Sequence, residues 1–144
     1  MKYFIYAVGL LLVLGVGGFF YLGQKSQSGV AEGLVSGKLV DCPSAPRCVT
    51  SEEGAEDSQS VDPLPVAAWA GLPTVIADMG GAVTSQEANY ISAEFTSSLF
   101  KFVDDVEFRL TPTGIHVRSA SRVGYSDRGV NRKRVEAIRE KIAG

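Results

Sequence analysis

The stretch from Leu99 to Arg134, LFKFVDDVEFRLTPTGIHVRSASRVGYSDRGVNRKR, decides the fold because it contains a hairpin, a polar loop and the start of a helix. Apolar and polar residues alternate over 105–111 and again over 115–121, and this period of two predicts two strands. The four residues TPTG between them are typical of a tight turn, with Pro112 suited to its second position and Gly114 to its fourth.

The apolar faces of these two strands predict the register of their pairing. If both faces are buried together, Phe108 lies opposite Val117 and Glu107 lies opposite Arg118. Opposite charges at facing positions of an antiparallel pair attract each other. We therefore expect an ion pair between Glu107 and Arg118.

Segments on either side of the hairpin complete the predicted domain. Two more strands are expected over 82–86 and 90–97, and apolar residues at helical spacing predict a helix over 66–79 before them. Pro73 lies inside that helix and should kink it or split it in two. The helical spacing returns over 129–143, after the polar loop.

These elements predict an α+β fold in which a four-stranded antiparallel sheet carries two helices packed on one face. The predicted globular domain covers residues 61–144. We expect Asp127 or Asn131 to cap the last helix, because both side chains accept hydrogen bonds from the free N–H groups of a first turn.

A long apolar run precedes the domain. Residues Tyr3–Leu22 are 20 consecutive positions without a charge, and a helix of that length spans the roughly 30 Å hydrocarbon core of a bilayer. A cleaved signal peptide is the alternative, although its apolar part is usually shorter and a small-x-small cleavage site follows it. We expect residues 1–24 to be an uncleaved, single-pass transmembrane anchor.

The segment 25–60 is polar and aperiodic, so we expect a flexible tether followed by an acidic loop. Cys42 and Cys48 enclose a proline-rich turn inside it, CPSAPRC, and their closeness predicts a disulfide. Zinc binding is the alternative, for which only His116 is available as a third ligand of the usual types. Because disulfides persist in oxidising compartments, the domain is expected on the periplasmic side of a bacterial inner membrane.

The formal net charge of -2 conceals an uneven distribution. Residues 32–107 contain 13 acidic and 3 basic side chains, whereas residues 108–144 contain 3 acidic and 9 basic ones. The two parts are expected to neutralise each other within one domain, and the alternative is that the basic part meets an anionic partner or a lipid head group. An extracytoplasmic domain held at a membrane is not expected to bind nucleic acid.

The motifs FVDDVEF and RSASRVGYSDRGVNRKRVEAIR resemble the signature of a bacterial and plastid family known only as domain of unknown function 1499. The segment CPSAPRCV, followed by Pro63-Leu64 ahead of the first helix, is also similar to the opening of that family. The resemblance spans about Lys38 to Arg139. It implies a small secreted or membrane-tethered domain. It implies no reaction and no catalytic residues, because none is established for the family.

Polar side chains of a few types gather in the hairpin and in the loop after it, more densely than a solvated surface requires. The predicted site residues are Asp104, Asp105, Glu107, Arg118, Ser119, Ser121, Arg122, Tyr125, Asp127, Asn131 and Arg132. Their first interpretation is a network of ion pairs and hydrogen bonds that pins the loop to the sheet. The function predicted with it is that of a non-catalytic interaction or accessory domain, with an envelope or membrane-protein partner.

Two alternative functions use the same residues. Arg122, Arg128 and Arg132 carry the forked guanidinium groups that bind a carboxylate, a phosphate or a lipid head group at the loop before the last helix. Asp104 and Asp105 are the alternative catalytic pair of a hydrolase, although neighbouring residues of a strand point to opposite faces. No cofactor and no metal site is predicted.

Overall fold

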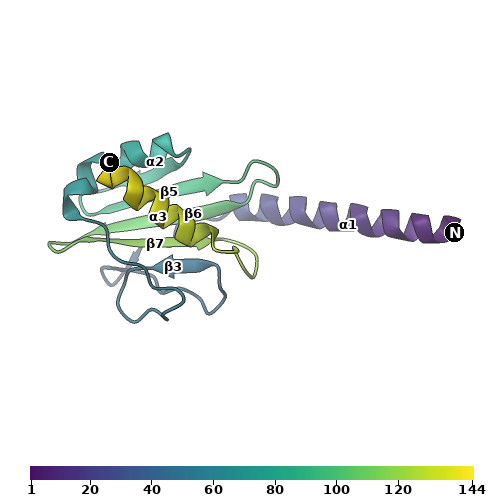
Figure 1. The fold of residues 1–144 in the computed structure, drawn as a ribbon, viewed down its shortest axis with the longest axis horizontal. Helices are drawn as coiled ribbons and strands as arrows, with labels where there is room; N and C mark the ends of the chain where they lie inside the picture. The colour runs from purple at the N-terminus through teal and green to yellow at the C-terminus, as the bar shows by residue number, and fades with distance from the viewer.

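The strands predicted around Phe108 form the centre of an antiparallel sheet in the computed structural model, which describes residues 1–144 (Figure 1). The elements in chain order are α1 (Lys2–Gln27), β1 (Leu34–Val35), β2 (Lys38–Leu39), β3 (Cys48–Thr50), η1 (Val66–Gly71), α2 (Leu72–Asp78), β4 (Ala82–Gln86), β5 (Tyr90–Thr96), β6 (Val103–Leu110), β7 (Ile115–Ser121) and α3 (Val130–Ala143). Five strands make up the sheet in the order β3-β7-β6-β5-β4, and β1 and β2 form a separate two-stranded ribbon. The α+β class is confirmed.

The predicted register of the central hairpin is also confirmed. β6 and β7 pair with Phe108 opposite Val117 and with Glu107 opposite Arg118. Because side chains alternate along a strand, this register sends the apolar residues of both strands to one face of the sheet and most of the charged residues to the other. We call these the helix face and the polar face.

The hydrophobic core lies on the helix face, between the sheet and α2 and α3 (Figure 1). Phe108, Ile76 and Ile138 are completely buried there, and burial of side chains of this size contributes roughly 1.5–3 kcal/mol each. The core residues come from β3, β5, β6, β7, α2, α3 and the loop before η1: Val49, Val61, Leu64, Leu72, Ile76, Ile91, Ala93, Val106, Phe108, Ile115, Val117, Val135 and Ile138.

The prediction of two helices is corrected to three, because the first predicted helix is divided. Residues Val66–Gly71 form the 3-10 helix η1, and α2 starts at Leu72 with Pro73 in its first turn. A proline is tolerated there because the first N–H groups of a helix have no partner within the helix. Pro73 therefore lies where α2 begins and divides the predicted helix into η1 and α2.

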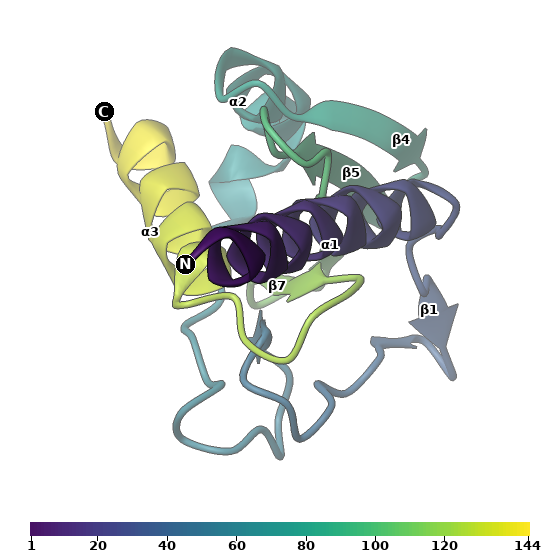
Figure 2. The same cartoon turned by 90° about the vertical axis from the view of Figure 1, so that its right-hand side faces the viewer.

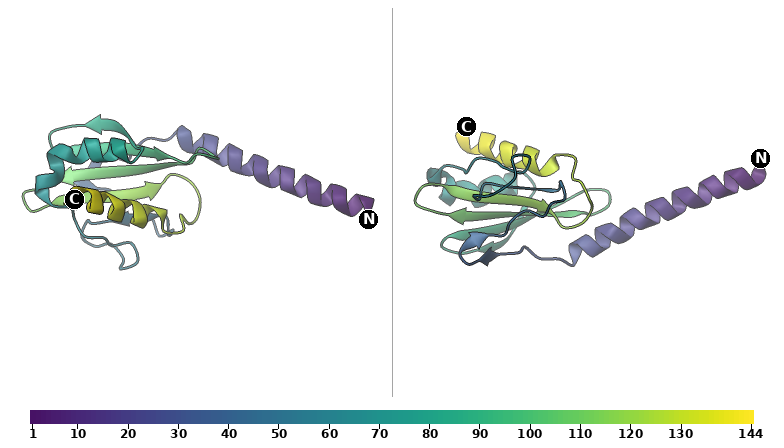
Figure 3. Two further views of the ribbon diagram at one scale, coloured as in Figure 1. Left: turned by 45° about the horizontal axis from the view of Figure 1, so that its top comes forward. Right: turned by 90° about the horizontal axis from the view of Figure 1, so that it is seen from below.

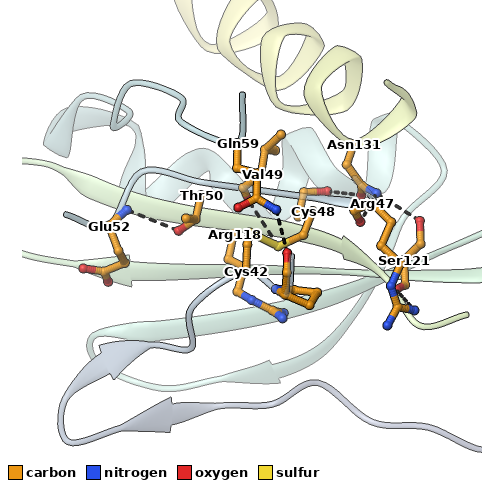
Figure 4. Close-up of a disulfide and its surroundings, with 12 residues drawn as sticks. Cys42, Arg47, Cys48, Val49, Thr50, Glu52, Gln59, Arg118, Ser121 and Asn131 are labelled. Carbon is orange, nitrogen blue, oxygen red and sulfur yellow. Dashed lines mark hydrogen bonds between the residues drawn. A yellow bond between two sulfur atoms is a disulfide. The ribbon is translucent and has the colours of Figure 1, made fainter. Parts of the chain in front are cut away.

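The prediction of four strands is wrong by one. Cys48–Thr50 pairs antiparallel with β7 as a fifth strand, inside the segment for which the sequence predicts a tether and a loop. Three residues are too few for an alternating pattern to emerge, and all three are buried. The predicted disulfide between Cys42 and Cys48 is present and joins the proline-rich turn to the start of this strand (Figure 4).

The chain between α1 and β3 covers the polar face. Figure 2 shows β1 on the side of the sheet opposite α3. The N–H of Gly33 donates to Glu107 at 2.7 Å, and the N–H of the buried Leu39 donates to Glu52 at 3.1 Å. We call residues 28–41 the crossing segment. Its contacts attach it to the sheet, which corrects the prediction of a flexible tether for this part of the chain.

The helix α1 extends from one end of the sheet (Figure 3). Its most apolar window of 18 residues has a mean hydropathy of 2.2, and none of that window is buried in the domain. A helix of this length and composition near an N-terminus fits a membrane anchor or a signal sequence. Its last turn is attached to the domain, since Gly23 and Ser26 are buried.

Candidate functional site

The predicted site residues fall into two clusters on opposite faces of the sheet. Asp105, Glu107, Arg118 and Arg122 lie together on the polar face, beneath the crossing segment. The cluster on the helix face, at the start of α3, consists of Asp104, Ser119, Ser121, Asp127 and Asn131. Tyr125 and Arg132 belong to neither cluster. The side chain of Tyr125 is 79% exposed, and Arg132 donates to the carbonyl oxygens of Ser58 and Ser60.

Arg122 is the centre of the polar-face cluster. Its guanidinium group forms a bidentate ion pair with Asp105, in which both N–O distances are 2.7 Å. It also binds Glu94. A further N–H donates to the carbonyl oxygen of Ser26 in the last turn of α1, at 3.1 Å. The hydrogen bonds to Asp105 are the main reason why the pKa of Arg122 is raised, against the opposing effect of burial.

The position of Arg122 has a clear electrostatic cause. Glu94 and Asp105 are direct cross-strand neighbours on β5 and β6, and two carboxylates at facing positions repel each other. The guanidinium of Arg122 lies between them and its side chain is only 8% exposed. One cation therefore connects β5 and β6 to α1.

A second buried ion pair lies beside it. Glu107 is completely buried and accepts hydrogen bonds from Arg118 at 3.1 Å, Tyr90 at 2.8 Å and the N–H of Gly33. The predicted pair of Glu107 and Arg118 is thus confirmed. Burial, followed by the hydrogen bond to Glu107, raises the pKa of Tyr90 well above its usual value. Tyr90 therefore serves as a donor and holds a proton at all ordinary pH values.

A cavity of about 500 Å³ lies between the crossing segment, the end of β7 and the last turn of α1. Arg47, Arg118 and Arg122 all line it, together with Lys25 and Asp105. The Nε atoms of Arg47 and Arg118 are buried and have no hydrogen-bond partner, and the Arg118 side chain is only 6% exposed. A buried N–H without an acceptor costs about 1–3 kcal/mol, so each of these two Nε–H groups is a local cost to the folded state.

Arg47 reaches this cavity from the loop closed by the disulfide (Figure 4). Its Nη1 donates to the carbonyl oxygen of Ser121 at 3.1 Å, and its own carbonyl oxygen accepts from the N–H of Ser121 and from the Asn131 side chain. Arg47 forms no ion pair with a carboxylate, unlike Arg118 and Arg122.

On the helix face, Asn131 organises the loop that leads into α3. Its side chain is completely buried. It accepts from Ser119 at 2.6 Å and from Arg134, and it donates to Ser121 and Asp127. Every polar atom of the amide is therefore bonded inside the protein, and none is left for a ligand.

The N-cap residue of α3 is Gly129, which corrects the prediction of Asp127 or Asn131, although Asp127 still bonds to the first turn from two residues before it. Asp127 accepts from the N–H groups of Gly129 at 2.9 Å and Asn131 at 2.8 Å. Burial alone raises the pKa of Asp127, but these hydrogen bonds outweigh it and leave the pKa below its usual value. Asp127 is therefore ionised and fully engaged in the loop.

The two predicted catalytic aspartates do not form a pair. Asp104 binds Arg134 of α3 at 2.7 Å on the helix face, whereas Asp105 binds Arg122 on the polar face. Arg134 also lies 4.7 Å from the ring centre of Phe95. Each carboxylate is neutralised by its own arginine, so the geometry does not support the hydrolase alternative.

Four important residues escape the sequence-based prediction. Glu94 and Tyr90 share the polar face with Asp105. The pairing of the predicted strands 90–97 and 105–111 would have indicated this, because Glu94 lies opposite Asp105 and Tyr90 opposite Arg109. Arg47 and Ser26 carry no such signal, because their partners lie more than 70 residues away in the chain.

A third ion-pair group lies toward the other end of the sheet. Glu52, which is 95% buried, accepts two hydrogen bonds of 2.7 Å from Arg109 and one from the N–H of Leu39. His116 Nδ1 lies 3.9 Å from Glu52 and 3.0 Å from the carbonyl oxygen of Ser51. Burial raises the pKa of Glu52, but the bonds from Arg109 and Leu39 outweigh it and lower the pKa overall.

Replacement of Asn131 tests the loop network. Asn131→Leu keeps the branching and the number of heavy atoms of the side chain but leaves Ser119, Arg134 and Asp127 without their buried partner. We expect the free energy of unfolding to fall by about 3 kcal/mol. Lys133→Ala, at an exposed position of the same helix, is the control and should change it by less than about 0.5 kcal/mol. Denaturant unfolding measures both, and equal stability of the two variants would contradict the network.

The lowered pKa of Glu52 predicts a pH dependence. The unfolded chain binds a proton to this carboxyl at a higher pH than the folded protein does, so its stabilising effect is present above the usual pKa of 4.5 and is lost as the pH falls below it. Thermal melting from neutral to acidic pH should show a smaller acid-induced loss for Glu52→Gln than for the wild type. Glu53→Gln, at an exposed neighbouring position, should keep the wild-type profile.

Comparison with known proteins places the chain in a family without assigning it a reaction. No curated protein and no solved structure matches it. One family model matches residues 38–142, which include β2 to β7 and nearly all of α3. The match covers both polar clusters, and the resemblance seen in the sequence motifs is therefore confirmed. The chain belongs to the family described as protein of unknown function DUF1499.

Proposed function

We propose that this protein is a single-pass, membrane-anchored binding domain without catalytic activity, and that the domain lies outside the cytoplasm. The observation that carries this proposal is the attachment of α1 to the domain. Ser26 is 1% exposed, its hydroxyl accepts from the N–H of Val103 at 2.8 Å, and its carbonyl oxygen accepts from Arg122. Cleavage of α1 as a signal peptide removes these buried contacts, so they favour a retained anchor.

The disulfide supports an extracytoplasmic position. Cys42 and Cys48 are bonded to each other and no free cysteine remains. Such bonds persist in oxidising compartments and are rare in the cytosol. Lys2 at one end of α1 and Lys25 at the other give no strong charge bias, so the disulfide is the main argument for the side of the membrane.

The absence of catalysis is inferred from how the reactive side chains are engaged. Asp104 and Asp105 are each paired with an arginine on opposite faces. His116 lies on the polar face and is hydrogen bonded to the carbonyl group of Ser51. Ser119 and Ser121 bond to Asn131 on the helix face. A serine nucleophile needs a base within hydrogen-bonding distance, and this arrangement does not provide one.

The ligand class that fits the cavity is an anionic group of the phosphate or carboxylate type. Arg118 and Arg122 approach the cavity from the end of β7, and Arg47 approaches it from the loop closed by the disulfide. Guanidinium groups bind such oxyanions through two parallel hydrogen bonds. Arg47 is the best placed of the three, because no carboxylate neutralises it.

The anchor is tested on the full chain in membranes. We expect the protein to remain in the bilayer after alkaline extraction, with an intact mass that includes α1, because the apolar run is long enough to span the hydrocarbon core. Alkylation should modify Cys42 and Cys48 only after reduction. A soluble mature protein that starts beyond Ser26 would overturn the proposed anchor.

Anion binding is tested by melting of the full chain in detergent, with inorganic phosphate as the probe and sodium chloride at matched ionic strength as the reference. At about ten times its dissociation constant, a bound anion stabilises the folded state by about 1.4 kcal/mol, which corresponds to a rise in melting temperature of about 5 °C. Arg47→Gln should lose this rise. Arg139→Gln, on the outer side of α3, should retain it, and an equal response in both variants would refute binding at this cavity.

A further inference from the structure

The connection between β5 and β6 lies against the anchor helix (Figure 1). The ring of Phe100, at the tip of this hairpin, stacks on Phe19 of α1 with 5.2 Å between ring centres. It also meets the ring of Phe20 edge-on at 5.3 Å, and Phe102 meets Phe19 edge-on at 6.4 Å. We call residues 97–102 the hairpin tip. Its aromatic side chains form one cluster with those of α1.

The contact is close at the level of the backbone as well. A Cβ atom on Gly23 would overlap the carbonyl oxygen of Phe100, so only glycine lets the helix and the hairpin tip approach this closely. The tip is itself closed by two hydrogen bonds between Ser97 and Phe102, at 2.8 and 2.9 Å. The position of the tip relative to α1 is therefore fixed.

The depth of this contact follows from the sequence of α1. Phe19 lies three positions before Leu22, the last residue of the apolar run 3–22. At a rise of 1.5 Å per residue, the ring of Phe19 lies about 5 Å inside the end of that run. If α1 spans the bilayer, the stacked ring of Phe100 therefore lies at the boundary between head groups and hydrocarbon.

The exposed side chains of the tip suit that boundary. Leu99 is 66% exposed although it is large and apolar, and Lys101 beside it is exposed as well. Apolar and aromatic groups enter the interface, while a lysine beside them keeps its ammonium group among the lipid head groups.

A cavity of about 470 Å³ adjoins the tip, between α1 and the loop before α3. Phe19, Leu22, Phe102 and Val123 are among the residues that line it. Its other wall is polar, since Asp104, Asp127 and Arg128 also line it. The apolar side of this cavity therefore lies along α1 and the hairpin tip, and its polar side lies at the loop before α3.

We infer that the hairpin tip is a second membrane contact, in which Leu99 and Phe100 enter the interfacial region of the bilayer beside the anchor. This inference rests on the proposed anchor. It adds that the domain sits directly on the lipid surface, in one orientation, with the hairpin tip toward the bilayer and the β6–β7 turn away from it.

The test uses tryptophan fluorescence of the full chain in vesicles of phosphatidylcholine brominated either near the head group or near the end of the acyl chain. Trp69, the single tryptophan, is first replaced by Phe. Three separate reporters are then introduced: Leu11→Trp in the middle of α1, Leu99→Trp at the tip, and Thr113→Trp at the β6–β7 turn. Strand β6 separates the last two positions by roughly 25 Å, from a rise of about 3.3 Å per residue.

We expect deep bromine atoms to quench the reporter at position 11, and shallow bromine atoms to reduce the emission at position 99 at least twofold. The reporter at position 113 should stay unquenched. If position 11 is quenched and position 99 is not, the anchor stands and the inference about the tip is overturned. A blue-shifted but unquenched emission at position 99 also overturns the inference, because it would place Leu99 against another protein or a second copy of this chain. If position 11 is not quenched, both the anchor and the tip contact are overturned.

Discussion

The guanidinium group of Arg122 is the interaction on which the arrangement of the rest depends. It lies at the end of β7 and joins Asp105 of β6, Glu94 of β5 and the carbonyl oxygen of Ser26 in α1. Without a cation at this point, the two carboxylates would face each other across neighbouring strands, partly removed from water, which is strongly unfavourable. The same contact fixes α1 to the end of the sheet. Sheet pairing and the attachment of α1 are thus coupled through one side chain.

The two faces of the sheet are stabilised in different ways. On the helix face, a continuous apolar core supplies the favourable free energy of burial. On the polar face, charged residues are buried beneath the crossing segment, and ion pairs of this kind offset their own desolvation only when each group is well bonded. Glu107 meets this condition with three donors, whereas the Nε atom of Arg118 does not. Both Arg118 and Arg47 line the cavity that we propose as the anion site.

Sequence reasoning predicted the elements whose pattern is local. The register of β6 and β7 followed from the alternation around Phe108, and the pair of Glu107 and Arg118 followed from that register. The division of the first helix followed from Pro73, although the 3-10 character of η1 did not. Strand β3 was missed because its three residues carry no period, and its place is determined by pairing with β7, whose partner residues lie 68 to 72 positions later in the chain.

Most residues of the two polar clusters stand out in the sequence, but their division between two faces of the sheet does not. Alternation along β6 implies that Asp104 and Asp105 diverge, yet nothing local indicates that their partners are Arg134 and Arg122 respectively. The role of the segment after α1 was also hidden, because a Gly- and Ser-rich composition is the same for a free linker and for a chain that bonds through its backbone. The N–H of Gly33, which donates to Glu107, is a contact of this second kind.

The crossing segment over the polar face has a consequence for the choice of a soluble fragment of this chain. The family match begins at residue 38, which makes that position an obvious place to start a soluble fragment. Such a fragment lacks Ser26 and Gly33, so Arg122 loses an acceptor and the buried carboxylate of Glu107 loses a donor and becomes open to water. A fragment that starts within the last turn of α1 keeps both contacts, whereas a fragment trimmed at the family boundary contains neither of them.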